Sequence, residues 1–135
     1  RVQLVCRNGR NPDACRMIGM VLVALVAVIH IWILVMEMFL WETPRIRRAF
    51  GTTPEFAANT RVLAANQGLY NGFLAAGLIL ALLEGVPGPG QGLAHFVLAC
   101  VVVAGLYGAA TVGRRILYVQ AAPAALGLLA VLVGI

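Results

Sequence analysis

The sequence is poor in charged residues. Only 11% of its 135 residues carry charge, whereas 61% are hydrophobic. A soluble domain normally carries about 25% charged residues, so this chain has too little polar surface to cover a globule in water. The composition therefore excludes an ordinary soluble protein and indicates an integral membrane protein with one compact domain.

Lysine is absent, and all ten basic residues are arginines. The formal net charge of +5 would be compatible with nucleic-acid binding. The arginines, however, lie at the ends of apolar runs and form no basic face, which is the distribution typical of membrane proteins. The pattern therefore argues against a nucleic-acid partner and predicts the lipid bilayer as the surroundings of the chain.

Cysteine is also scarce, and it forms no recognisable ligand pattern. The three cysteines include no CxxC pair and no Cys/His cluster, so we predict no metal site. Cys100 lies in an apolar run and is expected to be a small packing residue. Cys6 and Cys15 would be able to pair if the amino terminus lies outside the cytoplasm. No sequence feature identifies a cofactor, so whether the protein has one is unknown from the sequence.

Long apolar runs are what the sequence does contain. Four of them approach the ~20 residues needed to cross about 30 Å of hydrocarbon, and each must be a helix because bare backbone polar groups are not tolerated in lipid. We place them at residues 18–41, 59–83, 92–112 and 116–135. The fold predicted is all-α: a polytopic membrane protein forming an antiparallel bundle of four transmembrane helices, within a single domain at 17–135. Residues 1–16 differ from the rest and are expected to be a non-native or disordered leader.

The connections carry local structural signals. Thr53 followed by Pro54 predicts a helix start, with an N-cap and a proline in the first turn. Residues 44–50, closed by Gly51, predict a short interfacial helix whose arginines reach the lipid headgroups. Pro123 has no N–H and predicts a kink in the fourth segment.

The arginines also predict an orientation. The first and third loops lie on the same side of the membrane in a four-helix bundle, whereas the second loop and the carboxyl terminus lie on the other side and hold no arginine. The arginines of the first side are Arg45, Arg47, Arg48, Arg61, Arg114 and Arg115. Since positive charge favours the cytoplasm, we predict a multi-pass protein of the inner (plasma) membrane with its carboxyl terminus outside. If the four arginines of residues 1–16 belong to the mature chain, the contrast falls to six against four.

The polar residues within the apolar runs gather in the predicted cytoplasmic half. At ~1.5 Å per residue, Glu37 lies about 6 Å deep and His30 about 16 Å deep, on one stripe of the first helix. The second helix brings amide side chains to the same depths, which predicts a polar chamber that opens toward the cytoplasm. The predicted ligand-binding residues are His30, Glu37, Asn66, Gln67, Tyr70 and Asn71, and the secondary pocket candidates are Trp41, Tyr107, Thr111, Tyr118 and Gln120.

These residues also have purely structural interpretations. Amide side chains often join helices in membranes, and the GxxxG of Gly68 and Gly72 lets another helix approach closely, within the chain or in a homodimer. An ionised carboxylate in hydrocarbon costs about 2.5 kcal/mol or more, so Glu37 marks either a function or an ion pair. The candidate partners are an arginine of the first loop, Arg61 and Arg115.

Two stretches carry a family resemblance. The segment HIWILVMEMFLWETPRIRRAFG, followed by LAANQGLYNGFLAAGL, resembles the small bacterial membrane family known as domain of unknown function 1304, over residues 20–135. The matching positions are His30, residues 37–39, Trp41 with Pro44, Phe50 with Gly51, and residues 66–71. The resemblance implies a four-helix membrane bundle and no particular activity. A looser likeness to DoxX-type proteins is an analogy of fold alone.

Three functions are compatible with these observations. The first is the binding of a small amphipathic or lipid-like molecule in the polar pocket, anchored by His30 and Glu37. The second is a small oligomeric transporter or proton-coupled carrier, assembled through the face of Gly68 and Gly72. The third is an accessory subunit without a ligand. The sequence shows no nucleophile–base pair and no metal set, which disfavours an enzyme, although a buried Glu and His leave acid–base chemistry on a lipid headgroup open.

Overall fold

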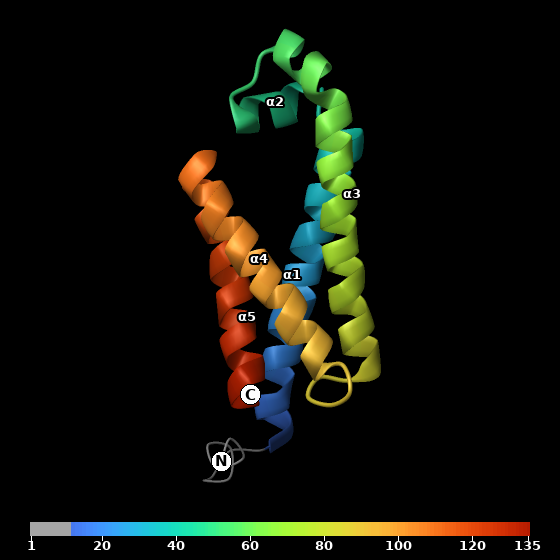
Figure 1. The fold of residues 1–135 in the computed structure, drawn as a ribbon, viewed down its shortest axis with the longest axis vertical. Helices are drawn as coiled ribbons and strands as arrows, with labels where there is room; N and C mark the ends of the chain where they lie inside the picture. Colours follow the sequence, from blue (N-terminus) through green and yellow to red (C-terminus); the bar gives the residue numbers. More distant parts are fainter. Residues whose placement is uncertain (1–11) are drawn as a thin grey trace.

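The computed structural model describes residues 12–135, and every regular element within that range is helical (Figure 1). The elements are α1 (Pro12–Phe39), α2 (Pro44–Phe50), α3 (Pro54–Glu84), α4 (Gln91–Thr111), the π-helical turn η2 (Leu117–Ala121) and α5 (Ala122–Val133). Cys6 and most of the predicted leader lie outside the described residues. The helix of α1 nevertheless includes residues 12–16, which we had expected to belong to that leader.

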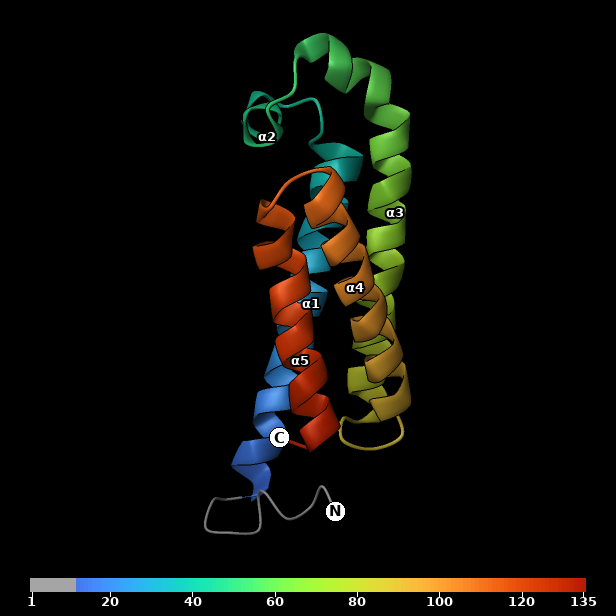
Figure 2. The same cartoon turned by 60° about the vertical axis from the view of Figure 1, so that its left-hand side comes forward.

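The long helices pack into an antiparallel bundle, which confirms the predicted all-α fold (Figures 1 and 2). Both α1 and α4 contact α3 and α5. Three helices are long and apolar enough to cross a membrane, namely Arg16–Phe39, Pro54–Glu84 and Gln91–Thr111. The fourth apolar helix, Leu117–Val133, is shorter. The chain is therefore a multi-pass membrane protein by the length and hydropathy of its helices.

The helix ends near α2 follow the local signals of the sequence. The Oγ1 of Thr53 accepts a hydrogen bond from the backbone N–H of Phe56 at 3.2 Å, so α3 begins at its capping residue and not at residue 59, where the apolar run starts. The helix α2 covers the predicted residues 44–50 and ends at Gly51, whose φ of 67° is left-handed.

The region before Pro123 departs from an ordinary α-helix. Proline has no N–H, and its ring clashes with the carbonyl group four residues earlier. The chain accommodates this by a wider π-helical turn, in which the N–H of Ala122 donates to the carbonyl oxygen of Leu117. The predicted distortion is thus a π turn. It lies against α4, where a Cβ on Gly105 would come within 2.8 Å of the backbone nitrogen of Ala121.

The main hydrophobic cluster occupies only the half of the bundle next to the α3–α4 loop. Its buried members include no residue of α1 after Ala27, none of α3 before Leu78 and none of α4 after Val101, and the partly buried Leu74 and Val102 pack at its edge. In this half, α3 and α4 meet closely, because a Cβ on Gly77 would lie 3.0 Å from the Cγ2 of Val97. Toward α2 the two helices diverge (Figure 1). The other half of the bundle is therefore splayed, and we call it the splayed half.

Candidate functional site

A carboxylate and an amide meet in the splayed half. The Nδ2 of Asn71 on α3 donates to the Oε2 of Glu37 on α1 at 2.9 Å, and it also donates to the backbone oxygen of Gln67 at 3.1 Å. Asn71 is buried and Glu37 is half-buried. Asn71 shares a helical stripe with Leu78, two turns away, which belongs to the main hydrophobic cluster. The pair therefore faces the inside of the bundle, beyond the end of the packed core.

Two glycines bring the carboxylate and the amide within reach of each other. A Cβ on Gly68 would lie 2.8 Å from the Cγ of Met38, and a Cβ on Gly72 would lie 2.5 Å from the Cδ1 of Leu34. The GxxxG stripe of α3 is thus packed against α1 of the same chain. The hypothesis of a homodimer through this face is corrected, because α1 already covers both glycines.

His30 lies two turns deeper on the same stripe of α1. Its side chain is 1% exposed, and its Nδ1 is 2.8 Å from the carbonyl oxygen of Val26. A carbonyl oxygen only accepts hydrogen bonds, so Nδ1 carries the hydrogen and Nε2 of the neutral ring keeps its lone pair. Seven residues correspond to about 10 Å along the helix, so His30 and Glu37 do not touch directly.

The arginines proposed as partners of Glu37 lie elsewhere. Arg61 pairs with Glu42 at 3.8 Å on the surface, and this is the one ion pair within residues 16–135. The Nη1 of Arg115 donates to the backbone oxygen of Ala49 at 3.4 Å. The structure therefore contradicts the hypothesis of an arginine–Glu37 ion pair, and a neutral amide holds this carboxylate instead.

Two other members of the predicted chamber point away from Glu37, and a third is exposed. The side chains of Asn66, Gln67 and Tyr70 are exposed on α3. Asn66 lies two positions before Gly68, and Tyr70 lies two positions after it. At about 100° per residue, both point to the side of α3 opposite its contact with α1. Tyr70 packs instead against Phe73 on the outer surface, with ring centroids 6.0 Å apart. Of the predicted wall, the structure brings Glu37 and Asn71 together, with His30 deeper on the same stripe, and it places Asn66 and Tyr70 on the outer side of α3.

The secondary candidates do not converge on the pair either. The Nε1 of Trp41 donates to the Oγ1 of Thr60 at 3.1 Å, and its ring packs against Phe50 at 5.2 Å, so Trp41 joins the end of α1 to α2 and α3. Tyr107, Thr111 and Tyr118 are exposed, whereas Gln120 is half-buried. The hydroxyl of Thr111 donates to the backbone oxygen of Tyr107 at 2.8 Å.

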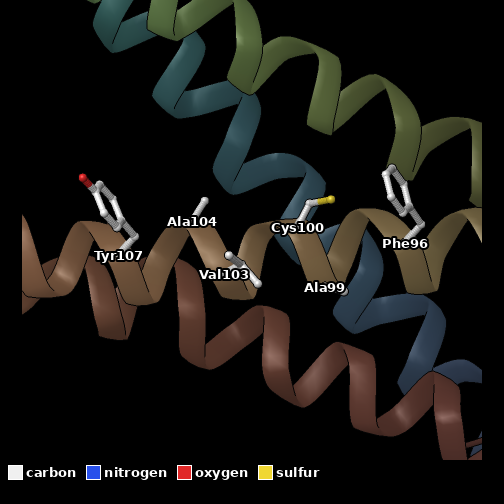
Figure 3. Close-up of a pocket in the computed structure, with 6 residues that line it drawn as sticks. All are labelled: Phe96, Ala99, Cys100, Val103, Ala104 and Tyr107. Atoms are coloured by element: carbon white, nitrogen blue, oxygen red, sulfur yellow. The ribbon is translucent and has the colours of Figure 1, made fainter.

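An apolar groove runs along α4 on its side toward α3, and the sequence did not predict it (Figure 3). It has a volume of about 540 Å³. Its lining residues are Phe96, Ala99, Cys100, Val103, Ala104 and Tyr107. Cys100 is half-buried and contributes to this lining. A stripe of apolar residues in a membrane helix has the same sequence pattern whether it faces lipid or a groove, so no signal in the sequence would have identified it.

The register of the helices places this groove at the depth of the polar pair. Gly77 of α3 packs against Val97 of α4. Because the two helices are antiparallel, six residues from this contact toward α2 lead to Val103 on α4 and to Asn71 on α3. These two residues therefore lie at the same level, about 9 Å nearer to α2 than the contact. A polar anchor and an apolar groove therefore occupy the same level of the splayed half. Within residues 16–135, no group of three or more metal-ligating side chains comes together.

These features define a multi-pass α-helical membrane protein with a polar pair inside its bundle. The chain matches the model of the family described as protein of unknown function (DUF1304) over residues 24–132, and it belongs to that family. The matched range includes Glu37, Asn71 and His30. Comparison with curated proteins gives no match, and comparison with solved structures gives none either.

Proposed function

We propose that this protein binds a small amphipathic molecule in the splayed half of its bundle, with Glu37 and Asn71 holding the polar end. One observation carries the proposal: the carboxyl group of Glu37 lies within the span Arg16–Phe39, and it is held by an amide instead of a basic side chain. A carboxylate at the centre of a membrane helix costs about 2.5 kcal/mol or more, and ionisable groups within membrane spans usually mark a functional site.

The surroundings of the pair support the same function. The main hydrophobic cluster ends before the level of Glu37 and Asn71, and Glu37 is only half-buried there. The groove of α4 lies at the same depth and supplies the apolar contact that a binding site for an amphipathic molecule needs. The transporter hypothesis is less consistent with these contacts, because it relied on assembly through Gly68 and Gly72, which α1 covers.

The test compares small molecules that co-purify with the protein in mild detergent, identified by mass spectrometry. We expect one species to be retained by the wild type and depleted about tenfold or more in Glu37→Gln, because a hydrogen bond to a charged group contributes about 1.5–3 kcal/mol. Glu55→Gln is the matched control, since Glu55 is exposed in the first turn of α3. Equal recovery of every small molecule from the three folded proteins would sink the proposal and favour a structural role.

We also propose that the single domain at residues 17–135 is oriented with α2 at the cytoplasmic face of the inner membrane. The α1–α3 connection and the α4–η2 turn lie at the same end of the bundle, where Arg115 contacts Ala49. This end carries six arginines, whereas at the other end the α3–α4 loop and the carboxyl terminus carry none and the start of α1 carries Arg16. Excess positive charge favours the cytoplasmic side.

Single cysteines test the orientation in a chain whose own three cysteines are replaced by alanine. Ala49→Cys and Pro89→Cys probe the two ends, and both positions are exposed. A membrane-impermeant maleimide added to intact spheroplasts should label Pro89→Cys, and Ala49→Cys should react only after the membrane is permeabilised. The opposite labelling pattern would reverse the orientation.

A further inference from the structure

We infer that the bound molecule is a single-chain amphiphile whose polar end is a protonated amine. This inference rests on the proposed function and adds the chemical class of the ligand. It follows from the hydrogen-bonding groups of Glu37 and Asn71 that have no partner in the pair, from the charge around Glu37, and from the shape of the groove on α4.

With Glu37 ionised, the polar pair offers acceptors only. The amide nitrogen of Asn71 has two hydrogens, and both are engaged, one with the Oε2 of Glu37 and one with the backbone oxygen of Gln67. What remains is the Oδ1 of Asn71 and the lone pairs of the Glu37 carboxyl oxygens, and these groups accept hydrogen bonds. A ligand that satisfies them must bring N–H or O–H donors.

His30 continues the same pattern deeper in the bundle. Its Nδ1–H is used by the carbonyl of Val26, so Nε2 is a second acceptor about 10 Å from Glu37 on the inner stripe of α1. The stripe that faces the inside of the bundle thus carries acceptors at two depths. This arrangement disfavours a ligand whose polar end is itself an acceptor, such as a carboxylate or a phosphate.

The charge of the region favours a cation. Three of the six arginines at this end of the bundle are engaged with backbone oxygens near α2: Arg47 with Glu42 at 3.1 Å, Arg48 with Pro44 at 3.2 Å, and Arg115 with Ala49. Within residues 16–135, the recorded ion pair joins Arg61 to Glu42 and leaves Glu37 without a cationic partner. Since a charge in a low-dielectric environment attracts an opposite charge strongly, a protonated amine would supply both the missing cation and the missing donors.

The groove on α4 sets the shape of the apolar end. It extends from Phe96 to Tyr107, a distance of about 16 Å along the helix. All six lining residues belong to this one helix. Phe96, Cys100, Ala104 and Tyr107 lie on its side toward α3, and Val103 points away from α3 (Figure 3). A narrow surface of this kind suits one extended hydrocarbon chain. Such a chain would lie along the groove, with its amine at the level of Asn71.

The test measures the binding of four probes with the same hydrocarbon chain to the purified full chain in an uncharged maltoside detergent at pH 7. The probes are dodecylamine, dodecyltrimethylammonium, dodecanol and dodecanoate, and native mass spectrometry gives their dissociation constants. We expect the wild type to bind dodecylamine at least about tenfold more tightly than the other three. Glu37→Gln should lose this preference, and the surface variant Glu55→Gln should keep it.

The outcomes separate this inference from the function on which it rests. Tighter binding of dodecanol or dodecanoate that still depends on Glu37 would overturn the amine and leave the proposed binding function intact. Equal binding of dodecyltrimethylammonium, which has the charge and no N–H, would overturn the role of hydrogen-bond donors. If the folded wild type and Glu37→Gln bind all four probes equally, there is no site at Glu37, and both proposals fail.

Discussion

Replacing Gly105 by leucine is expected to lower the free energy of unfolding by about 1–3 kcal/mol or more, the range for overpacking a tight contact. Gly105 is buried where α4 meets the π-helical turn, and its added Cβ would lie 2.8 Å from the nitrogen, 2.9 Å from the Cβ and 3.1 Å from the Cα of Ala121. Two of these atoms belong to the backbone, so no side-chain rotation relieves the clash. The measurement is the thermal unfolding midpoint of the purified protein in detergent, followed by tryptophan fluorescence.

A matched control lies on the same helix. Gly92 is exposed in the first turn of α4, and a Cβ there would meet nothing within 4 Å. Gly92→Leu should leave the midpoint unchanged or raise it slightly, because leucine has a higher helix propensity than glycine. If the two leucine variants unfold at the same temperature, α4 and η2 are not in close contact at Gly105.

Asn71→Leu is expected to cost about 1–3 kcal/mol, because it leaves the Glu37 carboxyl group without its donor inside the bundle. Leucine is similar in size to asparagine, so the loss reflects the hydrogen bond more than a cavity. Asn66→Leu is the control, since Asn66 is exposed on the opposite side of α3. It should change stability by no more than about 0.5 kcal/mol. Thermal unfolding in detergent again provides the measurement.

A double-mutant cycle isolates the interaction between the two residues. In a Glu37→Leu background, Asn71→Leu should cost less than it does in the wild type, because the donor no longer has its carboxylate acceptor. The coupling energy between these changes should be at least about 0.5 kcal/mol. If Asn71→Leu has the same cost in both backgrounds, the bond between Asn71 and Glu37 contributes nothing to stability.

Local signals in the sequence were sufficient for the helix ends near α2. A threonine N-cap, a proline in the first turn and a glycine after the last turn act through neighbouring backbone groups. Thr53 and Gly51 therefore occupy the predicted positions. Pro123 predicted a distortion for an equally local reason, and the structure adds that it takes the form of a π turn.

The predicted chamber was partly wrong because the position of a residue along the helix axis does not determine which side of the helix its side chain occupies. The rise per residue places Asn66 near the depth of Glu37 and Tyr70 near the depth of His30, but it does not say which side of α3 faces α1. Gly68 gives that direction, since it packs against α1, and residues two positions away from it must point outward. Asn71 lies three positions from Gly68 and therefore stays on the inner side.

The sequence by itself determined the membrane class, the four apolar helices, the helix caps and the presence of polar groups at membrane depth. These properties depend on composition, on hydropathy over about twenty residues, and on hydrogen bonds between near neighbours. Only the tertiary structure decided that Gly68 and Gly72 meet α1 of the same chain, that Asn71 and not an arginine holds Glu37, and that α3 and α4 diverge beyond the packed core. The physical reason is that a helix in lipid is apolar on every side, so hydrophobicity does not mark the face that contacts another helix. Close steric fit and single hydrogen bonds between distant segments select that face.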